Sequence, residues 1–184
     1  MLKKIVVIGP ESTGKSTLCE RLALHYGTHW CPEYAREFLL TNGMEYTYDD
    51  LLVIAKGQLA KEDEYSSMSQ GGTDPEENRS MLFIDTDMYV MKVWSEFVFG
   101  KCHPWILQQV VEREYDLYLL CNTDLPWVSD DLREYPDPVT RDNLFRMYQD
   151  IMINQSTPWQ LISGSDPEHR FQTAVQALDH WNKS

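Results

Sequence analysis

The chain has little positive charge for its size and no long apolar run. Its 184 residues include 16 Lys and Arg against 29 Asp and Glu, which gives a formal net charge of −13. A surface of that sign repels the nucleic-acid backbone and anionic membranes, so we expect neither as a partner. Because no apolar stretch is long enough to cross a bilayer and no secretory leader is recognisable, we expect a cytoplasmic location.

Cysteine is also scarce, with four residues and no Cys-x-x-Cys pair. This pattern argues against a disulfide framework and against a zinc site of ordinary spacing, and it favours buried thiols in a reducing compartment. The length is sufficient for one domain with a substantial core. We therefore expect a single domain over residues 1–184.

What the sequence does contain is a phosphate-binding motif near its start. The motif reads Gly9-Pro10-Glu11-Ser12-Thr13-Gly14-Lys15-Ser16 and matches the P-loop pattern, between an apolar run at 5–8 and a helix-forming stretch. Its glycines let successive backbone N–H groups face one anion, and the helix N-terminus adds positive partial charge. The lysine reaches the β- and γ-phosphates, and the Ser16 hydroxyl ligates Mg²⁺. The residues expected to contact the nucleotide are Gly9, Glu11, Ser12, Thr13, Gly14, Lys15, Ser16 and Thr17.

Short apolar strands alternate with helical patterns along the whole chain. Strands are expected at 4–8, 81–84, 117–121 and 159–162, with a weaker one at 28–31. Helices are expected at 16–26, 34–41, 48–66, 88–99, 105–113, 141–154 and 168–181. This alternation predicts an α/β P-loop NTPase/kinase fold, a parallel sheet of about five strands with helices on both faces. Ligands of such sheets gather at the carboxyl ends of the strands.

Two carboxylates follow the strand at 81–84. Asp85 is expected to engage Mg²⁺ behind Ser16, as the acid at a strand tip does in P-loop enzymes. Asp87 is expected to contact the substrate or act as its base. The alternative for Asp87 is a helix cap at the start of the helix at 88–99.

A second polar cluster, Glu33-Tyr34-Ala35-Arg36, follows the weak strand. Glu33 is a candidate general base toward a hydroxyl, or a hydrogen-bond acceptor for a sugar. Arg36 lies on the same helical face as Glu33, and the alternative is a plain surface ion pair. The sequence does not rank Glu33 against Asp87 as the base.

The segment 124–141 is expected to form a lid, because it is punctuated by prolines and carries arginines after a buried strand. Arg133 and Arg141 are predicted to close over the transferring phosphoryl group. Trp127 is a candidate to stack on a flat ring, with Tyr34 on its other side, and Asp124 or Asp130 is a candidate to bind hydroxyls. The alternative is a charged surface loop. The apolar stripe of Trp94, Phe97 and Val98 is interpreted as core rather than as a cofactor-binding surface.

Together these clusters resemble the ribosylnicotinamide kinase domain of the NadR-type NAD-salvage proteins, an AAA-like P-loop kinase family. The resemblance rests on the P-loop continued through Thr17-Leu18, on Glu33-Tyr34-Ala35-Arg36, on Phe83-Ile84-Asp85-Thr86-Asp87, on His103-Pro104, and on Pro126-Trp127-Val128 with Asp130, Arg133 and Arg141. The motifs stand in the family's order over nearly the whole chain. Asp131 departs from the family pattern, in which glycine is usual.

The resemblance implies transfer of the γ-phosphoryl group of ATP to the 5′-hydroxyl of nicotinamide riboside, a small-molecule substrate, with Mg²⁺ as cofactor. GTP stays open as the donor, although the guanine signature Asn-Lys-x-Asp is absent from the sequence. Two alternatives also stay open: a kinase for another nucleoside or nucleotide, and a regulatory module that binds ATP or GTP. Nothing in the sequence fixes the oligomeric state.

Overall fold

The computed structural model describes residues 2–71, 81–130, 132 and 134–183. Within these residues the strands are β1 (Lys3–Ile8), β2 (His29–Cys31), β3 (Met81–Asp85), β4 (Leu117–Cys121) and β5 (Trp159–Ile162). The helices in the same ranges are α1 (Lys15–Tyr26), α2 (Tyr34–Asn42), α3 (Tyr48–Gly71), α4 (Met88–Phe99), α5 (Pro104–Glu112), α6 (Pro138–Asn154) and α7 (Pro167–Trp181).

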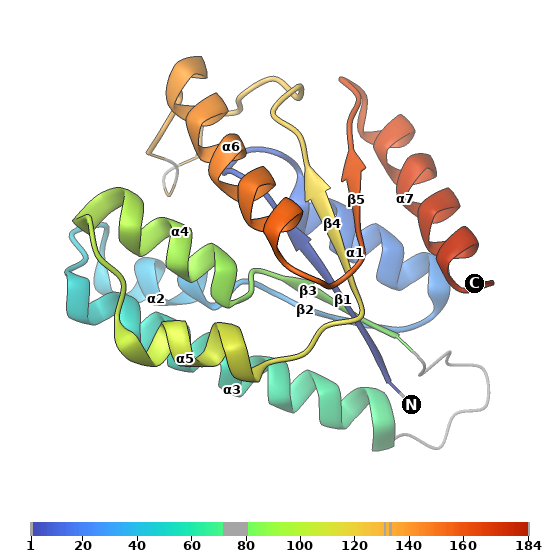
Figure 1. Cartoon of the computed structure of the whole chain (residues 1–184), viewed down its shortest axis with the longest axis horizontal. Coiled ribbons are helices and arrows are strands. Elements are labelled where there is room, and N and C mark those ends of the chain that lie inside the picture. The colour runs from blue at the N-terminus through green and yellow to red at the C-terminus, as the bar shows by residue number, and fades with distance from the viewer. Residues whose placement is uncertain (1, 72–80, 131, 133, 184) are drawn as a thin grey trace.

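The five strands of the described chain form one parallel sheet in the order β2-β3-β1-β4-β5. The first strand is therefore the central one, and β3 and β4 are buried along their whole length. A parallel sheet of this kind needs helices on both faces, which explains why its strands are continuous apolar runs. The strands run in one direction, so the loops that follow β1 and β4 meet at the same edge (Figure 1).

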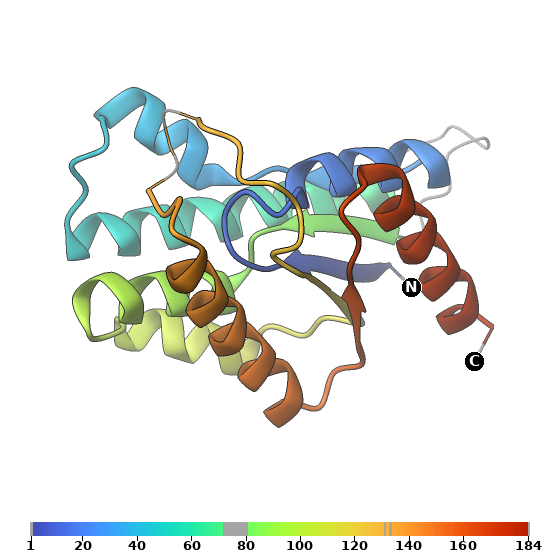
Figure 2. The same cartoon turned by 90° about the horizontal axis from the view of Figure 1, so that it is seen from above.

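Alternate residues of each strand pack on opposite faces of the sheet. Ile5 and Val7 of β1 face a core that α1 and α7 complete, whereas Val6 and Ile8 face a core that α4 and α6 complete. Viewed from above, α1 and α6 lie on opposite sides of the sheet (Figure 2). A third cluster of buried side chains comes from α2, α3, α4 and α5 and packs these four helices together beside the sheet. The site loops thus rest on elements that are packed on both sides.

The predicted fold is confirmed, and each predicted strand is present with its bounds correct to within one residue. Two predictions of local structure were wrong. The helix expected at 48–66 is longer, because α3 continues to Gly71, and the loop expected over 66–80 otherwise falls on residues 72–80, which lie outside the described residues. The helix expected from residue 141 begins earlier, at Pro138, so residues 138–141 belong to α6 and not to the lid. The helix begins there because the Asp137 carboxylate accepts the Thr140 N–H at 2.7 Å.

None of the helices in the described ranges is both long enough and apolar enough to cross a membrane.

Candidate functional site

The loop between β1 and α1 has a backbone that only glycine permits at two points. Gly9 has φ 141°, and a Cβ there would stand 2.6 Å from the Cys121 carbonyl oxygen at the end of β4. Gly14 has φ 77° and immediately precedes the first residue of α1. Because the loop is pressed against β4 and then turns into a helix, its N–H groups are left to face a common centre.

Polar contacts inside the loop fix its shape. The buried Thr13 hydroxyl donates to the Pro10 carbonyl at 2.7 Å, and the Lys15 ammonium donates to the same carbonyl at 3.0 Å. Lys15 therefore lies folded back over the loop, at the position from which its ammonium can meet a phosphate. The predicted P-loop residues Gly9 to Thr17 all line one cavity.

Asp85, at the carboxyl end of β3, is 1% exposed, and neither of its oxygens has a hydrogen-bond partner among the described residues. Burial raises its pKa, while Lys15 and the Ser16 hydroxyl act in the opposite direction. A buried carboxylate without partners beside a hydroxyl and an ammonium fits a divalent cation, for which oxygen ligands are preferred. Ser16 and Asp85 are thus suited to hold Mg²⁺, as expected from the sequence.

Glu33 lies at the N-cap of α2 and lines the same cavity. The Thr86 hydroxyl reaches its Oε1 at 3.4 Å, and Thr86 itself is held at φ 83° in the turn after β3. Burial raises the pKa of Glu33, and repulsion from Asp85 raises it further, against the effect of Lys15. Glu33, Asp85 and Lys15 therefore form one electrostatic group.

Asp87 is placed differently from Glu33. One of its oxygens accepts the Val90 N–H at 3.1 Å and caps α4, and the other accepts the Tyr118 hydroxyl at 2.9 Å. Burial raises the pKa of Asp87 to about 7, with both hydrogen bonds opposing the rise. The described lining of the P-loop cavity includes Glu33 but not Asp87, so the structure supports the alternative of a helix cap.

The cavity beside the P-loop has a volume of about 420 Å³ and an aromatic wall. Trp94 and Phe97 of α4 both line it. Trp94 also packs against the third core cluster, as expected, whereas Phe97 and Val98 are each 36% exposed, so the interpretation of these two residues as core was wrong. The spacing of an amphipathic helix does not distinguish a face that covers a core from one that covers a cavity. Further described residues that line it are Arg36, Leu39, Val93, Asp130, Glu134, Tyr135, Leu144 and Tyr148.

The two rings expected to sandwich a ligand are not in the described lining of this cavity. The ring of Tyr34 packs against Gly57 of α3, where an added Cβ would lie 2.1 Å from a ring carbon. Trp127 is half-buried in the segment after β4, and its buried Nε1 has no hydrogen-bond partner among the described residues. Phe97 and Trp94 occupy the wall instead.

The segment between β4 and α6 is tied to the P-loop by the loop's own side chains. The Ser12 hydroxyl accepts the Val128 N–H at 2.9 Å, and the Glu11 carboxylate accepts the N–H groups of Glu134 and Tyr135. Figure 1 shows this segment passing over the upper edge of the sheet, beside the P-loop. The sequence placed Glu11 and Ser12 at the nucleotide, and the structure adds a contact of both with the expected lid.

Three further side chains predicted from the sequence lie on or under this lid. Arg36 pairs with Asp130 at 2.9 Å, which joins α2 to the lid across the cavity. Arg141 is 6% exposed and donates to the carbonyls of Ser12 and Leu125 at 3.4 and 3.3 Å. Arg141 therefore braces the lid root against the P-loop, whereas Arg133 lies outside the described residues.

Arg170 of α7 is a residue that the sequence reasoning missed. It is 3% exposed, and its guanidinium donates to the carbonyls of Thr13, Asn122 and Gly164 at 2.7 to 2.8 Å. It also pairs with Asp124. One side chain thus links the P-loop to the ends of β4 and β5. No local sequence motif indicates this role of Arg170, because its partners are as much as 157 positions away.

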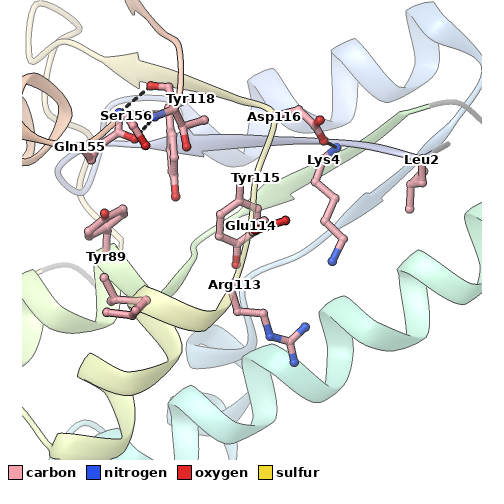
Figure 3. A pocket seen from close by; sticks show the side chains of 13 residues that line it. Leu2, Lys4, Tyr89, Arg113, Glu114, Tyr115, Asp116, Tyr118, Gln155 and Ser156 are labelled. Carbon is pink, nitrogen blue, oxygen red and sulfur yellow. Dashed lines mark hydrogen bonds between the residues drawn. The ribbon is translucent and has the colours of Figure 1, made fainter.

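A second cavity, of about 560 Å³, lies at the opposite edge of the sheet, around the starts of β1 and β4 (Figure 3). Its lining includes Tyr118, whose hydroxyl binds Asp87, and two basic residues. Both bases are already paired: Lys4 with Glu62 at 2.8 Å, and Arg113 with Asp63. Each of these two basic side chains is therefore held by a carboxylate of α3, and the lining also includes the acidic residues Glu114 and Asp116.

Three features define a nucleotide-binding protein of the P-loop kinase class. They are a P-loop at the start of a helix, a buried acid at the end of the neighbouring strand, and a lid that is hydrogen-bonded to the P-loop. A family model described as an AAA domain matches residues 4–170, and the chain belongs to this family.

Sequence relatives confirm the resemblance drawn from the motifs. The trifunctional NAD biosynthesis/regulator protein NadR of Salmonella typhimurium is 25% identical over 181 residues, and that of Escherichia coli is 26% identical. Each alignment covers 96% of this chain but 42% of the relative, so the chain spans less than half the length of these proteins.

Solved structures agree with the fold. A crystal structure of NadR protein in complex with NR has a TM-score of 0.78 at 21% identity, covering 100% of this chain and 50% of that one. Thymidylate kinase from Ehrlichia chaffeensis has a TM-score of 0.66 at 14% identity, covering 96% of this chain and 98% of the other. The chain therefore has a kinase-like P-loop fold related to both.

Proposed function

We propose that the protein transfers the γ-phosphoryl group of ATP to the 5′-hydroxyl of nicotinamide riboside and so forms nicotinamide mononucleotide. The observation that carries the proposal is the continuity of one cavity, which runs from the P-loop past Glu33 to the aromatic wall beneath the lid. Donor and acceptor would thus meet in one space beside the lid, which would limit the access of water to the phosphoryl transfer. The similarity to NadR supports this choice of acceptor.

The donor phosphates would lie on the N–H groups of the P-loop and at the start of α1. Lys15 would leave the Pro10 carbonyl and donate to the β- and γ-phosphates. Ser16 and Asp85 would hold Mg²⁺, which when bound supplies positive charge to the transferring phosphoryl group. The buried Asp85 carboxylate would then lie beside a cation instead of standing without a hydrogen-bond partner.

Glu33 is the base that the geometry favours. It lines the cavity, and its raised pKa brings its proton affinity closer to what a base needs near neutral pH. The Thr86 hydroxyl orients its Oε1. Asp87 would act on α4, whose side chains form the acceptor wall, by capping that helix.

The acceptor end of the cavity suits a cationic ring. Trp94 and Phe97 supply aromatic faces, and Glu33, Asp130 and Glu134 supply carboxylates around them. A nicotinamide ring that carries positive charge is attracted by both features. An acceptor that carries a phosphate would need cations, and Arg36 of the described lining already pairs with Asp130.

A nucleoside monophosphate kinase is the second candidate, because the thymidylate kinase fold matches nearly end to end. The two candidates differ in whether the acceptor brings a phosphate of its own. Assays with nicotinamide riboside and with thymidine monophosphate, each read by the mass of the product, separate them.

Replacement of Glu33 by Gln tests the assignment of the base. We expect Glu33→Gln to lower kcat with nicotinamide riboside by at least about 100-fold. Asp87→Asn, which keeps a capping oxygen, should lower it by less than about tenfold. Glu37→Gln, an exposed change on the same helix, is the control and should retain wild-type turnover. Circular dichroism verifies the fold of each variant. A greater loss in Asp87→Asn than in Glu33→Gln would contradict the assignment.

A further inference from the structure

Tyr46 joins the lid to the aromatic wall of the cavity through a single hydroxyl group. The residue lies between α2 and α3 and is half-buried. Its hydroxyl accepts the Trp94 indole N–H at 2.8 Å and donates to the Glu134 carboxylate at 2.8 Å. Trp94 and Glu134 both line the cavity, but they belong to α4 and to the lid. The two sides of the acceptor site therefore share one hydrogen-bonded link.

This link continues to the nucleotide-binding loop. The backbone N–H of Glu134 donates to Glu11 of the P-loop at 3.0 Å, so the same lid residue holds the P-loop with its backbone and Tyr46 with its side chain. A continuous path of hydrogen bonds thus leads from Glu11 through Glu134 and Tyr46 to Trp94. Its two ends are the donor site and the acceptor wall.

The hydroxyl of Tyr46 fixes the rotation of the Trp94 ring in a way that packing alone does not. The two rings meet edge to face, with centroids 4.9 Å apart and an angle of 71°. Packing of this kind tolerates some rotation of the indole, whereas an N–H donor must point at its acceptor. Without the hydroxyl, the Trp94 N–H and the Glu134 carboxylate would both lose a partner. A separate ring contact between Phe97 and Tyr135, at 5.2 Å, would still join α4 to the lid.

We propose that Tyr46 is a positioning residue for the acceptor, which holds the Trp94 ring against the closed lid so that wall and lid form one binding surface. The proposal rests on the proposed function, because it takes Trp94 to face the acceptor ring. Tyr46 does not line the cavity among the described residues, so it acts through Trp94 and Glu134. Its removal should therefore weaken acceptor binding and leave donor binding intact.

Steady-state kinetics of the full chain with Tyr46→Phe test this role. We expect the KM for nicotinamide riboside to rise about tenfold, with the KM for ATP within about twofold of wild type. The matched control is Tyr48→Phe, two positions along the chain, whose ring contacts Phe99 and Lys101. This control should leave both constants unchanged. An unchanged KM for the riboside in Tyr46→Phe, or a parallel change in both constants, would overturn the proposal.

A double-mutant cycle tells the link apart from a general loss of stability. If Tyr46 works through Glu134, the change in kcat/KM for the riboside in the double variant Tyr46→Phe/Glu134→Gln should fall well short of the product of the single changes. Independent, multiplicative effects would refute the link. The two proposals fail in different ways: absence of riboside phosphorylation by the wild type would refute the proposed function, whereas wild-type phosphorylation with an unchanged Tyr46→Phe would refute the role of Tyr46 alone.

Discussion

The two carboxylates that follow β3 differ in role because of what each one touches. Asp85 has no hydrogen-bond partner in the described structure and faces Ser16 and Lys15, which fits a cation site. Asp87 has both oxygens engaged, by Val90 and by Tyr118. The sequence could predict that this pair stands at a strand end, because strand tips follow from the apolar run. It could not rank Asp87 against Glu33, because the hydroxyl that engages Asp87 comes from Tyr118, which belongs to a different strand.

Asp87 should make the stability of the protein depend on pH. Burial raises its pKa to about 7 in the folded state, so folding favours the protonated form. The resulting stabilisation is fully present below the pKa of the unfolded chain and is lost as the pH rises through about 7. Asp87→Asn cannot titrate, so the free energy of unfolding of the wild type should fall relative to the variant by on the order of 2 kcal/mol between about pH 5 and pH 7.5.

Urea denaturation of both proteins at these two pH values measures the difference. Glu33 and Asp85, whose pKa values burial also raises, are common to the two proteins and cancel in the comparison. An equal pH dependence in wild type and Asp87→Asn would show that Asp87 is ionised in both the folded and unfolded states.

The position of the lid depends mainly on contacts with residues outside the lid segment. The prolines and charges of the lid predicted a loop over the site, and the structure ties the described residues Val128, Glu134 and Tyr135 to the P-loop. Its attachments come from elsewhere: Glu11 and Ser12 of the P-loop, and Arg36 of α2. The P-loop pattern leaves these two loop positions free, so their contacts with residues more than 100 positions away could not be predicted.

Glu11→Gln should loosen the lid without unfolding the protein. A carboxylate accepts the N–H groups of both Glu134 and Tyr135, whereas an amide has one acceptor oxygen and would turn a donor toward the other N–H. We expect amide hydrogen exchange of the segment 134–137 to speed up by about tenfold, since hydrogen bonds to charged groups are worth more than 1 kcal/mol.

Hydrogen-exchange mass spectrometry of the nucleotide-free protein makes this measurement. Glu20→Gln, at an exposed position on α1, is the matched control and should exchange like the wild type. If the segment 134–137 exchanges at the wild-type rate in Glu11→Gln, the P-loop does not hold the lid.

At the scale of the whole molecule, the fold was accessible from the sequence and the closure of the site was not. Apolar runs alternating with amphipathic segments specify a parallel sheet, because each buried strand must be covered on both faces. Arg170, in contrast, reaches from α7 to Thr13 of the P-loop, and only the finished sheet brings them together. The excess of acidic over basic residues in the chain is also found at the site, since carboxylates outnumber cations among the described residues that line the cavity.

A comparison of acceptors tests the central claim most directly. The purified protein is given ATP, Mg²⁺ and, in separate reactions, nicotinamide riboside, cytidine, thymidine or thymidine monophosphate, and products are identified by mass. We predict phosphorylation of nicotinamide riboside with a kcat/KM at least about tenfold above that of each neutral nucleoside and of the monophosphate, because the aromatic and acidic wall favours a cationic ring. Preference for thymidine monophosphate would contradict the account, and so would ATP hydrolysis that yields no phosphorylated product with any acceptor.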